Sequence, residues 1–415
     1  MLFVVAVSLP DITPLPAQMS QTGATDPKDR IQTIDILRGI ALFGVLMVNL
    51  LTEFRVSIFQ QFVPTALAGS PMDRLLTGFV TYALDMKAFA LFSLLFGVGL
   101  AIQFDRLAPL GRAPYWLRRR LIVLLAFGLC HLLIIWNGDI LTEYALAGLL
   151  LLPLIRQDKT TVAFYSLAML AFYFAMPLLY IPAYWPSTYA FSLDVQAANH
   201  VYPDGSFLTI LQFSAHELKL MLPLHESVFP RTLALMLLGA WVWKAGLLQD
   251  LQQHRYKLLV FGLISTAMGV GATLAESGNL LAGQPLIGDV LSRLGPAVQA
   301  LGYAALIAVA ASQPYLERIL RVFAPLGRMA FTNYILESLI FSWIFMGYGL
   351  GQFGRLSETT AFVLGIVVYV GQLIASLLWL RRFRFGPLEW LWRTLMYGQS
   401  QPMWKATLGP AELQR

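Results

Sequence analysis

Ten long apolar stretches, separated by short connectors, constrain the fold of this 415-residue chain more than any other feature. Each has close to the roughly 17–25 apolar residues that a helix needs to cross a bilayer, and alternating hydrophobicity of the barrel type is absent. They lie at residues 34–54, 78–104, 118–136, 139–155, 161–182, 229–248, 257–276, 288–311, 328–348 and 360–380. The pattern predicts an all-α, polytopic membrane protein with about ten transmembrane helices.

Composition agrees with a chain that has membrane lipids as its main partners. It is 57% hydrophobic and 13% charged, whereas soluble domains average about 45–50% apolar and 25% charged residues. A basic rim facing anionic lipid accounts for the net charge of +6, so no nucleic-acid partner is expected. The pairs His216-Glu217 and His225-Glu226 do not match the zinc-protease spacing, and no metal site or tightly bound cofactor is predicted.

The distribution of Lys and Arg predicts the orientation. With the N-terminus inside, 21 cations fall on the cytoplasmic side, six fall on the outer side, and Arg38 and Lys87 lie within spans. Cytoplasmic loops of membrane proteins carry an excess of Lys and Arg. We therefore expect both termini to lie in the cytoplasm.

The chain is otherwise organised as one transmembrane unit with two predicted interfacial helices. A loop as long as the fifth connector is usually functional or separately structured. The expected parts are a disordered lead (1–30), a single transmembrane domain (31–398), its extracytoplasmic loop (183–228) with an interfacial helix (206–222), a second interfacial helix (388–397) and a C-terminal tail (399–415).

Charged residues within the spans are the first candidates for function. A charge at mid-helix costs about 2.5–3.5 kcal/mol on insertion scales, so each should face protein or water and have a partner. On the inner half, Arg38 is expected to pair with Asp35 or Glu337, and Asn333 shares a helix face with Glu337. A packing salt bridge and a ligand-binding role both remain open for this group.

A larger polar set lies on the outer half of the spans and predicts a polar cavity open to the outside. It comprises Asn49, Glu53, Asp85, Lys87, His131, Asp139, Glu143, Glu276 and Arg293. From both halves together, the predicted substrate-binding residues are Arg38, Asn49, Asp85, Arg293, Asn333 and Glu337.

His131 and Asp139 are the predicted catalytic pair. Asn137-Gly138 is a turn signal, so the next span doubles back and brings Asp139 close to His131. An aspartate that orients an imidazole is the usual support for a general base. The alternative is that His131 only hydrogen-bonds a neighbouring helix. Gly97-Val98-Gly99 is too short for a phosphate-binding loop and indicates close helix packing instead.

Five blocks of sequence carry a family resemblance. They are IDILRGIA (34–41), LFSLLFGVG (91–99), the segment from His131 to Leu141, LGRMAFTNY (326–334) and FGPLEWLWR (385–393). In this order they resemble the YeiB-like family of bacterial inner-membrane proteins, which is also known as domain of unknown function 418. The likeness covers about residues 30–400 and implies a location in the bacterial inner membrane.

That family is regarded as a relative of transmembrane acyltransferases, which carry acyl groups from cytosolic acyl-CoA to an acceptor such as a glycan. In the polysaccharide acyltransferases, an arginine in the first span is followed, after ten residues, by an essential histidine. Arg38 matches the arginine, but Asn49 stands in the place of the histidine. Asparagine cannot act as a general base, so His131 is the candidate for that role.

Two classes of function follow. In a membrane acyltransferase, acyl-CoA would meet the basic inner face near Arg118, Arg119 and Arg120, because guanidinium groups suit phosphates. In a transporter for a small solute, the embedded carboxylates and His131 would bind the solute or relay protons. No internal repeat of the kind that many secondary transporters carry is evident in the sequence.

The orientation can be tested with two cysteine substitutions in a Cys130→Ser background. Asn199→Cys lies in the predicted outer loop and should react with an impermeant thiol reagent in intact cells. Gln313→Cys lies in a predicted inner loop and should react only after the cells are opened. Labelling of both positions in intact cells would contradict the predicted topology.

Overall fold

The computed structural model describes residues 31–64, 69–179, 185–277 and 283–405, and the regular elements in these ranges are helices. The predicted lead (1–30), the end of the tail (406–415), and residues 180–184, at the junction of the fifth span and the outer loop, lie outside the described residues. The elements, with η for 3-10 and π turns, are α2 (Gln32–Asn49), η2 (Leu50–Phe54), η3 (Ile58–Phe62), α3 (Pro71–Phe79), η4 (Val80–Leu84), α4 (Lys87–Leu107), η5 (Ala108–Leu110), α5 (Ala113–Cys130), η6 (His131–Ile135), α6 (Leu141–Leu154), α7 (Lys159–Ala175), η7 (Met176–Leu179), α8 (Thr188–Asp204), α9 (Phe207–Lys244), α10 (Leu251–Ser277), α11 (Pro285–Ala311), α12 (Pro314–Leu320), η8 (Arg321–Phe323), α13 (Ala324–Arg328), α14 (Ala330–Phe345), α15 (Glu358–Arg382) and α16 (Pro387–Tyr397).

Length and composition make this a helical membrane protein. Six of the described helical segments are long and apolar enough to cross a membrane, and α6 and α14 are apolar but shorter. The all-α prediction is therefore confirmed.

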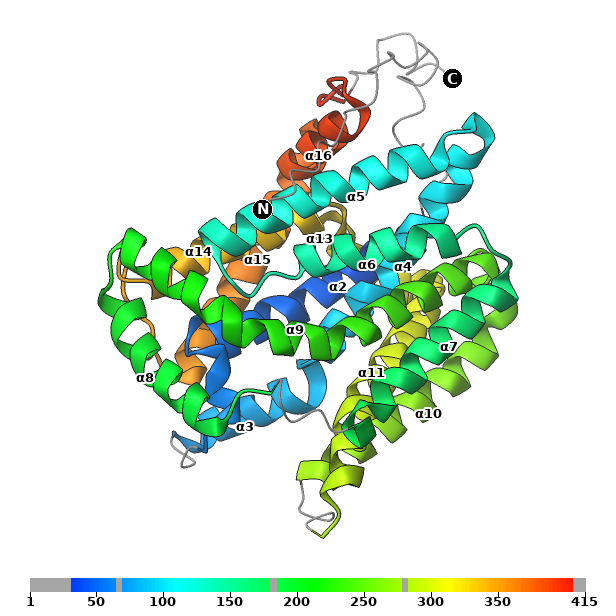
Figure 1. Cartoon of the computed structure of the whole chain (residues 1–415). Helices are drawn as coiled ribbons and strands as arrows, with labels where there is room; N and C mark the ends of the chain where they lie inside the picture. Colours follow the sequence, from blue (N-terminus) through cyan, green and yellow to red (C-terminus); the bar gives the residue numbers. More distant parts are fainter. Residues whose placement is uncertain (1–30, 65–68, 180–184, 278–282, 406–415) are drawn as a thin grey trace, which may run out of the picture.

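Helix α2 forms the centre of the bundle (Figure 1). In its apolar window, 83% of the residues are buried inside the protein, and α4, α11, α13, α14 and α15 all contact it. A helix that is apolar on all sides is typical of such a central position.

Helices α4 and α9 approach closely because glycines face each other's backbone. A Cβ atom at Gly97 would lie 1.9 Å from the carbonyl oxygen of Met236, and one at Gly239 would lie 2.0 Å from that of Leu94. Small residues allow this close helix contact in membrane proteins. The interpretation of Gly97-Val98-Gly99 as a packing element is confirmed.

The second predicted span, 78–104, is not one continuous helix. Helix α3 passes into the π turn η4, which ends at Leu84, and Met86 takes a left-handed conformation with φ of 60° before α4 begins. The ammonium group of Lys87 donates a 2.7 Å hydrogen bond to the carbonyl oxygen of Thr81. Lys87 thus satisfies a backbone acceptor at the break, which hydrocarbon could not do.

The predicted interfacial helix at 206–222 does not exist as a separate element. Residues 207–244 form one helix, α9, with Pro223 and Pro230 inside it. At 1.5 Å per residue it is about 57 Å long, so it extends well beyond the thickness of the hydrocarbon. Its first half packs with α8 and η3, where Phe59 and Phe62 stack on Phe191. Met221 of α9 is buried in the same apolar cluster, which joins the extension to α8 and η3.

The second predicted interfacial helix, 388–397, corresponds to α16. Pro387 stands at its start and Gly398, with φ of 69°, follows its end. It packs against α5, because the indole of Trp392 donates to the carbonyl oxygen of Arg120 at 2.9 Å and Arg119 donates to that of Leu395 at 3.1 Å. Figure 1 shows the two helices side by side at one end of the bundle.

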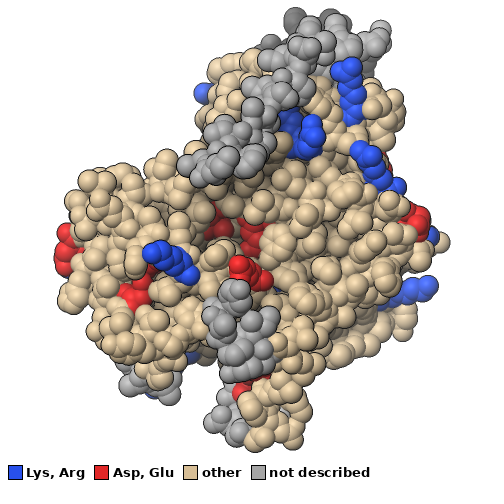
Figure 2. Space-filling view, in the orientation of Figure 1, with Lys and Arg blue, Asp and Glu red and all other residues tan. Residues whose placement is uncertain are grey.

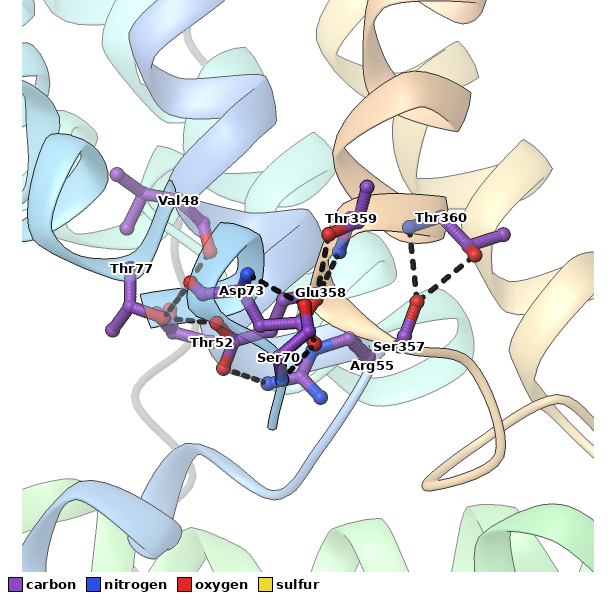
Figure 3. Close-up of polar contacts among 10 residues, drawn as sticks. All are labelled: Val48, Thr52, Arg55, Ser70, Asp73, Thr77, Ser357, Glu358, Thr359 and Thr360. Atoms are coloured by element: carbon purple, nitrogen blue, oxygen red, sulfur yellow. Dashed lines mark hydrogen bonds and ion pairs between the residues drawn. The ribbon is translucent and has the colours of Figure 1, made fainter. Parts of the chain in front are cut away.

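A polar cluster at the end of α2 joins α3 to α15 (Figure 3). One oxygen of Asp73 accepts hydrogen bonds from the backbone and hydroxyl of Ser70, which begins α3. Its other oxygen accepts from the backbone and hydroxyl of Thr359 in the first turn of α15. Arg55 pairs with Glu358 at 2.9 Å beside it. A single carboxylate therefore caps two helices that are distant in sequence.

We expect Asp73→Ala to lower the melting temperature of the purified protein by roughly 2–4 °C or more, because the hydrogen bonds of its carboxylate to the starts of both helices are lost together. Asp158→Ala is the matched control, since Asp158 is exposed and caps only α7. A smaller shift is expected there. Equal shifts in the two variants would contradict a role for Asp73 in joining α3 to α15.

Candidate functional site

The structure brings His131, Asp139 and Ser338 into one hydrogen-bonded chain. Nδ1 of His131 lies 2.9 Å from an oxygen of Asp139, and Nε2 lies 2.9 Å from the hydroxyl oxygen of Ser338. All three side chains are buried, with exposed fractions of 1%, 1% and 2%. The order of contacts is that of an Asp-His-Ser triad.

Local structure fixes the first two members. His131 is the first residue of the π turn η6, which follows α5 directly; π turns inside helices are frequent at functional sites. The second oxygen of Asp139 accepts from the backbone of Thr142 at 2.7 Å and so caps the start of α6. Asp139 therefore has one oxygen for the helix and one for the imidazole.

Aromatic side chains surround the imidazole. The ring of Tyr334 lies 5.2 Å from that of His131, and its hydroxyl makes long, 3.4 Å contacts with the carbonyl of Gly138 and the amide of Ile140. The indole of Trp136 donates to Glu53 at 3.2 Å. These contacts fill the space around the turn with protein atoms.

An arginine-lined cavity lies between the hydrogen-bonded His131, Asp139 and Ser338 side chains and the end of the bundle where α16 packs on α5. It encloses about 1110 Å³ of space not occupied by atoms, counted out to its open mouth. Four arginines and a carboxylate, namely Arg38, Arg120, Arg328, Arg393 and Glu389, line it together with Gln103 and apolar or aromatic residues from α2, α4, α5, α6, α14 and α16. Its residues Ile140, Leu141 and Tyr334 are neighbours of Asp139 or of His131.

The guanidinium groups are held in different ways. Arg120 stacks on Trp392 with its central carbon 3.7 Å from the ring centroid. Arg38 lies 3.9 Å from Asp35 and 3.4 Å from the carbonyl oxygen of Leu95. A guanidinium group is a planar fork with five N–H donors.

Glu389 adds a negative charge to the cavity wall. Its carboxylate accepts from the backbone of Phe331 and Thr332 at the start of α14. Burial raises the pKa of this carboxyl above its usual value, although the hydrogen bonds from Thr332 and Phe331 oppose that change. Glu389 thus fastens α16 to α14.

The inner polar residues are arranged differently from the prediction. Arg38 pairs with Asp35, which is one of its two predicted partners. It does not pair with the other, Glu337. The side chain of Glu337 is buried beside that of Gln372 in α15. Asn333 donates to the hydroxyl of Ser376 at 2.9 Å and ties α14 to α15.

The polar cavity predicted for the outer residues stays a prediction. Glu143 pairs with His225 at 3.1 Å, and Glu53 and Asp139 also lie close enough to His225 to interact with it electrostatically. Acidic side chains do lie in a hollow near the middle of the face in Figure 2, while basic ones stand near its upper end. Arg293 packs on the ring of Tyr173 and donates to the carbonyl oxygen of Ser227. Asn49 is buried, and its side-chain oxygen has no partner in the described part of the chain.

Sequence reasoning missed Ser338 and two of the arginines in the cavity, Arg328 and Arg393. Ser338 directly follows Glu337 in a span, but a lone serine in an apolar helix gives no signal. Of the three arginines expected to meet acyl-CoA, only Arg120 lines this cavity, and Arg118 lines a separate cleft. In the described ranges no group of three or more His, Cys, Asp or Glu side chains could hold a metal ion.

Comparison with known proteins places the chain among proteins without an assigned activity. Residues 242–399 match a family described as "Protein of unknown function (DUF418)". The chain is 31% identical to the uncharacterized protein YxaH of Bacillus subtilis (strain 168), over 94% of this chain and all of that protein. The chain belongs to the DUF418 family. It is also 29% identical to the uncharacterized protein YeiB of Escherichia coli (strain K12), over 90% of this chain and 98% of YeiB.

The DUF418 match divides the site between two parts of the sequence. Ser338, Arg328, Arg393 and Glu389 lie within the matched residues, whereas His131 and Asp139 precede them. The similarity to YxaH and YeiB extends over most of the chain. The family assignment by resemblance is confirmed, and an activity does not follow from it.

Proposed function

We propose that this protein is a membrane acyltransferase, which takes an acyl group from acyl-CoA and passes it to an acceptor such as a glycan. One observation carries the proposal: an arginine-lined, largely apolar cavity reaches the residues beside the buried His131–Asp139 pair. In this proposal the protein lies in the bacterial inner membrane, with both termini and the cavity mouth on the cytoplasmic side.

The cavity has the chemistry that an acyl thioester of coenzyme A requires. Guanidinium groups bind phosphate oxygens through paired hydrogen bonds, and Arg120, Arg328 and Arg393 provide them. Phe92, Phe96 and Leu124 supply an apolar wall for the arm of coenzyme A that ends in the thioester. Small-molecule sites usually combine apolar walls with a few placed polar groups.

His131 supplies the base. Because Asp139 accepts from Nδ1, the neutral imidazole carries its proton there and leaves Nε2 free to take one. Asp139 also stabilises the imidazolium once it forms. The pair can therefore remove a proton from an acceptor hydroxyl or amine and return it to the leaving thiolate.

The donor site is tested by acyl-CoA binding to protein in nanodiscs. We expect Arg393→Gln to weaken binding roughly tenfold or more, because a charged hydrogen bond to phosphate is lost. Arg118→Gln removes the same charge from the same end of the molecule but outside this cavity, so binding should stay unchanged. If the unmodified protein binds no acyl-CoA and instead moves a solute across vesicles, the transporter alternative holds.

The base is tested by substitutions at the pair. His131→Ala and Asp139→Asn should each reduce acyl transfer by roughly 10²–10⁴-fold while abundance stays near that of the unmodified protein. The double variant should be scarcely worse than either single one, because the two groups act as a unit. Transfer that persists in His131→Ala would remove this residue from the mechanism.

A further inference from the structure

We propose that Ser338 is a nucleophile that carries the acyl group as an ester between donor and acceptor. This inference rests on the proposed function and adds a covalent intermediate to it. Ser338 stands 2.9 Å from Nε2 of His131, which is the nitrogen that remains free when Asp139 accepts from Nδ1.

The geometry meets the requirements of an activated serine. A serine hydroxyl is a weak nucleophile unless a base lies within hydrogen-bond reach and a third group orients that base. Both conditions hold for Ser338, and the three members come from the end of α5, the start of α6 and the middle of α14. The Ser338 oxygen also lies 3.3 Å from the backbone oxygen of Tyr334, a longer contact than the one with His131.

The reaction balances with these groups alone. The Ser338 oxygen attacks the thioester carbonyl, and His131 takes the hydroxyl proton. The C–S bond breaks, and His131 gives that proton to the departing thiolate of coenzyme A. An acceptor hydroxyl then attacks the ester carbonyl, His131 takes its proton, and the Ser338 oxygen recovers it as the new ester leaves.

The position of Ser338 suits a relay. Tyr334, which lines the cavity, lies one helical turn before Ser338 on α14, or about 6 Å along the helix. Its hydroxyl is held only by two contacts of 3.4 Å, which are long for hydrogen bonds. In this proposal the Tyr334 ring rotates to open the cavity toward Ser338, so that an acyl group reaches the hydroxyl while the bulky coenzyme stays among the arginines.

Radiolabelled acetyl-CoA, supplied without acceptor, tests the proposal. The unmodified protein should release free coenzyme A in a burst and retain about one acetyl group per chain. The label should resist acid, be removed by alkali, and map to the peptide that contains Ser338. Ser338→Ala should retain no label but still bind acetyl-CoA.

Two further variants keep the test decisive if Ser338→Ala folds poorly. Ser338→Cys should retain the label as a thioester, which neutral hydroxylamine removes, unlike the serine ester. Ser342→Ala is the matched control, because Ser342 is another buried serine one turn further along α14, and it should label normally.

The outcomes separate the two proposals. Acyl transfer and labelling that persist in Ser338→Ala would overturn the covalent role but leave the acyltransferase standing, with direct transfer to the acceptor. If the unmodified protein transfers acyl groups but never carries an acid-stable label, the covalent role is also overturned and the acyltransferase proposal stands. Failure of the unmodified protein to bind acetyl-CoA would overturn both.

Discussion

Hydrocarbon offers no hydrogen-bond partners, and this constraint governs where polar side chains stand in the bundle. Lys87 turns back to a carbonyl at the break before α4, Arg120 stacks on Trp392, and Asp139 divides its oxygens between a helix start and an imidazole. In each case a group that lipid would exclude is retained by a specific protein contact. Those contacts in turn bring distant segments together.

Some buried polar atoms of the described residues are exceptions to this rule, and they are spread over the bundle, from Asp194 in α8 to Gln299 in α11. Glu337 has a buried carboxyl beside the side chain of Gln372, and it directly precedes Ser338 in the sequence. The buried oxygen of Asn49 has no partner in the described part of the chain. Embedded ionisable groups in membrane proteins mark substrate or proton pathways more often than packing. Glu337 is therefore of interest beside the His131 chain, even though its expected partner Arg38 lies elsewhere.

The arginine cavity and the buried triad-like chain support each other as parts of one site. A site that only bound phosphate would not need a histidine. A histidine base supported by aspartate would not by itself need a cluster of guanidinium groups. Their connection through Tyr334 and Ile140 joins charge recognition at one end with acid–base chemistry at the other. Membership of the DUF418 family assigns no activity, so this combination of features is what the proposed acyl transfer depends on.

Local pattern determined the helical class, the packing role of Gly97, the helix at 387–397 and the closeness of His131 to Asp139. The last was accessible because only seven residues and one turn separate the pair. Hydrophobic periodicity and turn-forming residues are properties of neighbouring positions, so a single sequence is enough to recognise them.

Tertiary structure alone decided which distant side chains meet. Ser338 is more than 200 positions from His131, and Arg393 reaches the cavity only because α16 packs on α5. The same holds for the continuity of α9, where packing of its first half on α8 outweighs two prolines. Contacts between segments depend on how whole helices pack, and no periodicity within one segment encodes that arrangement.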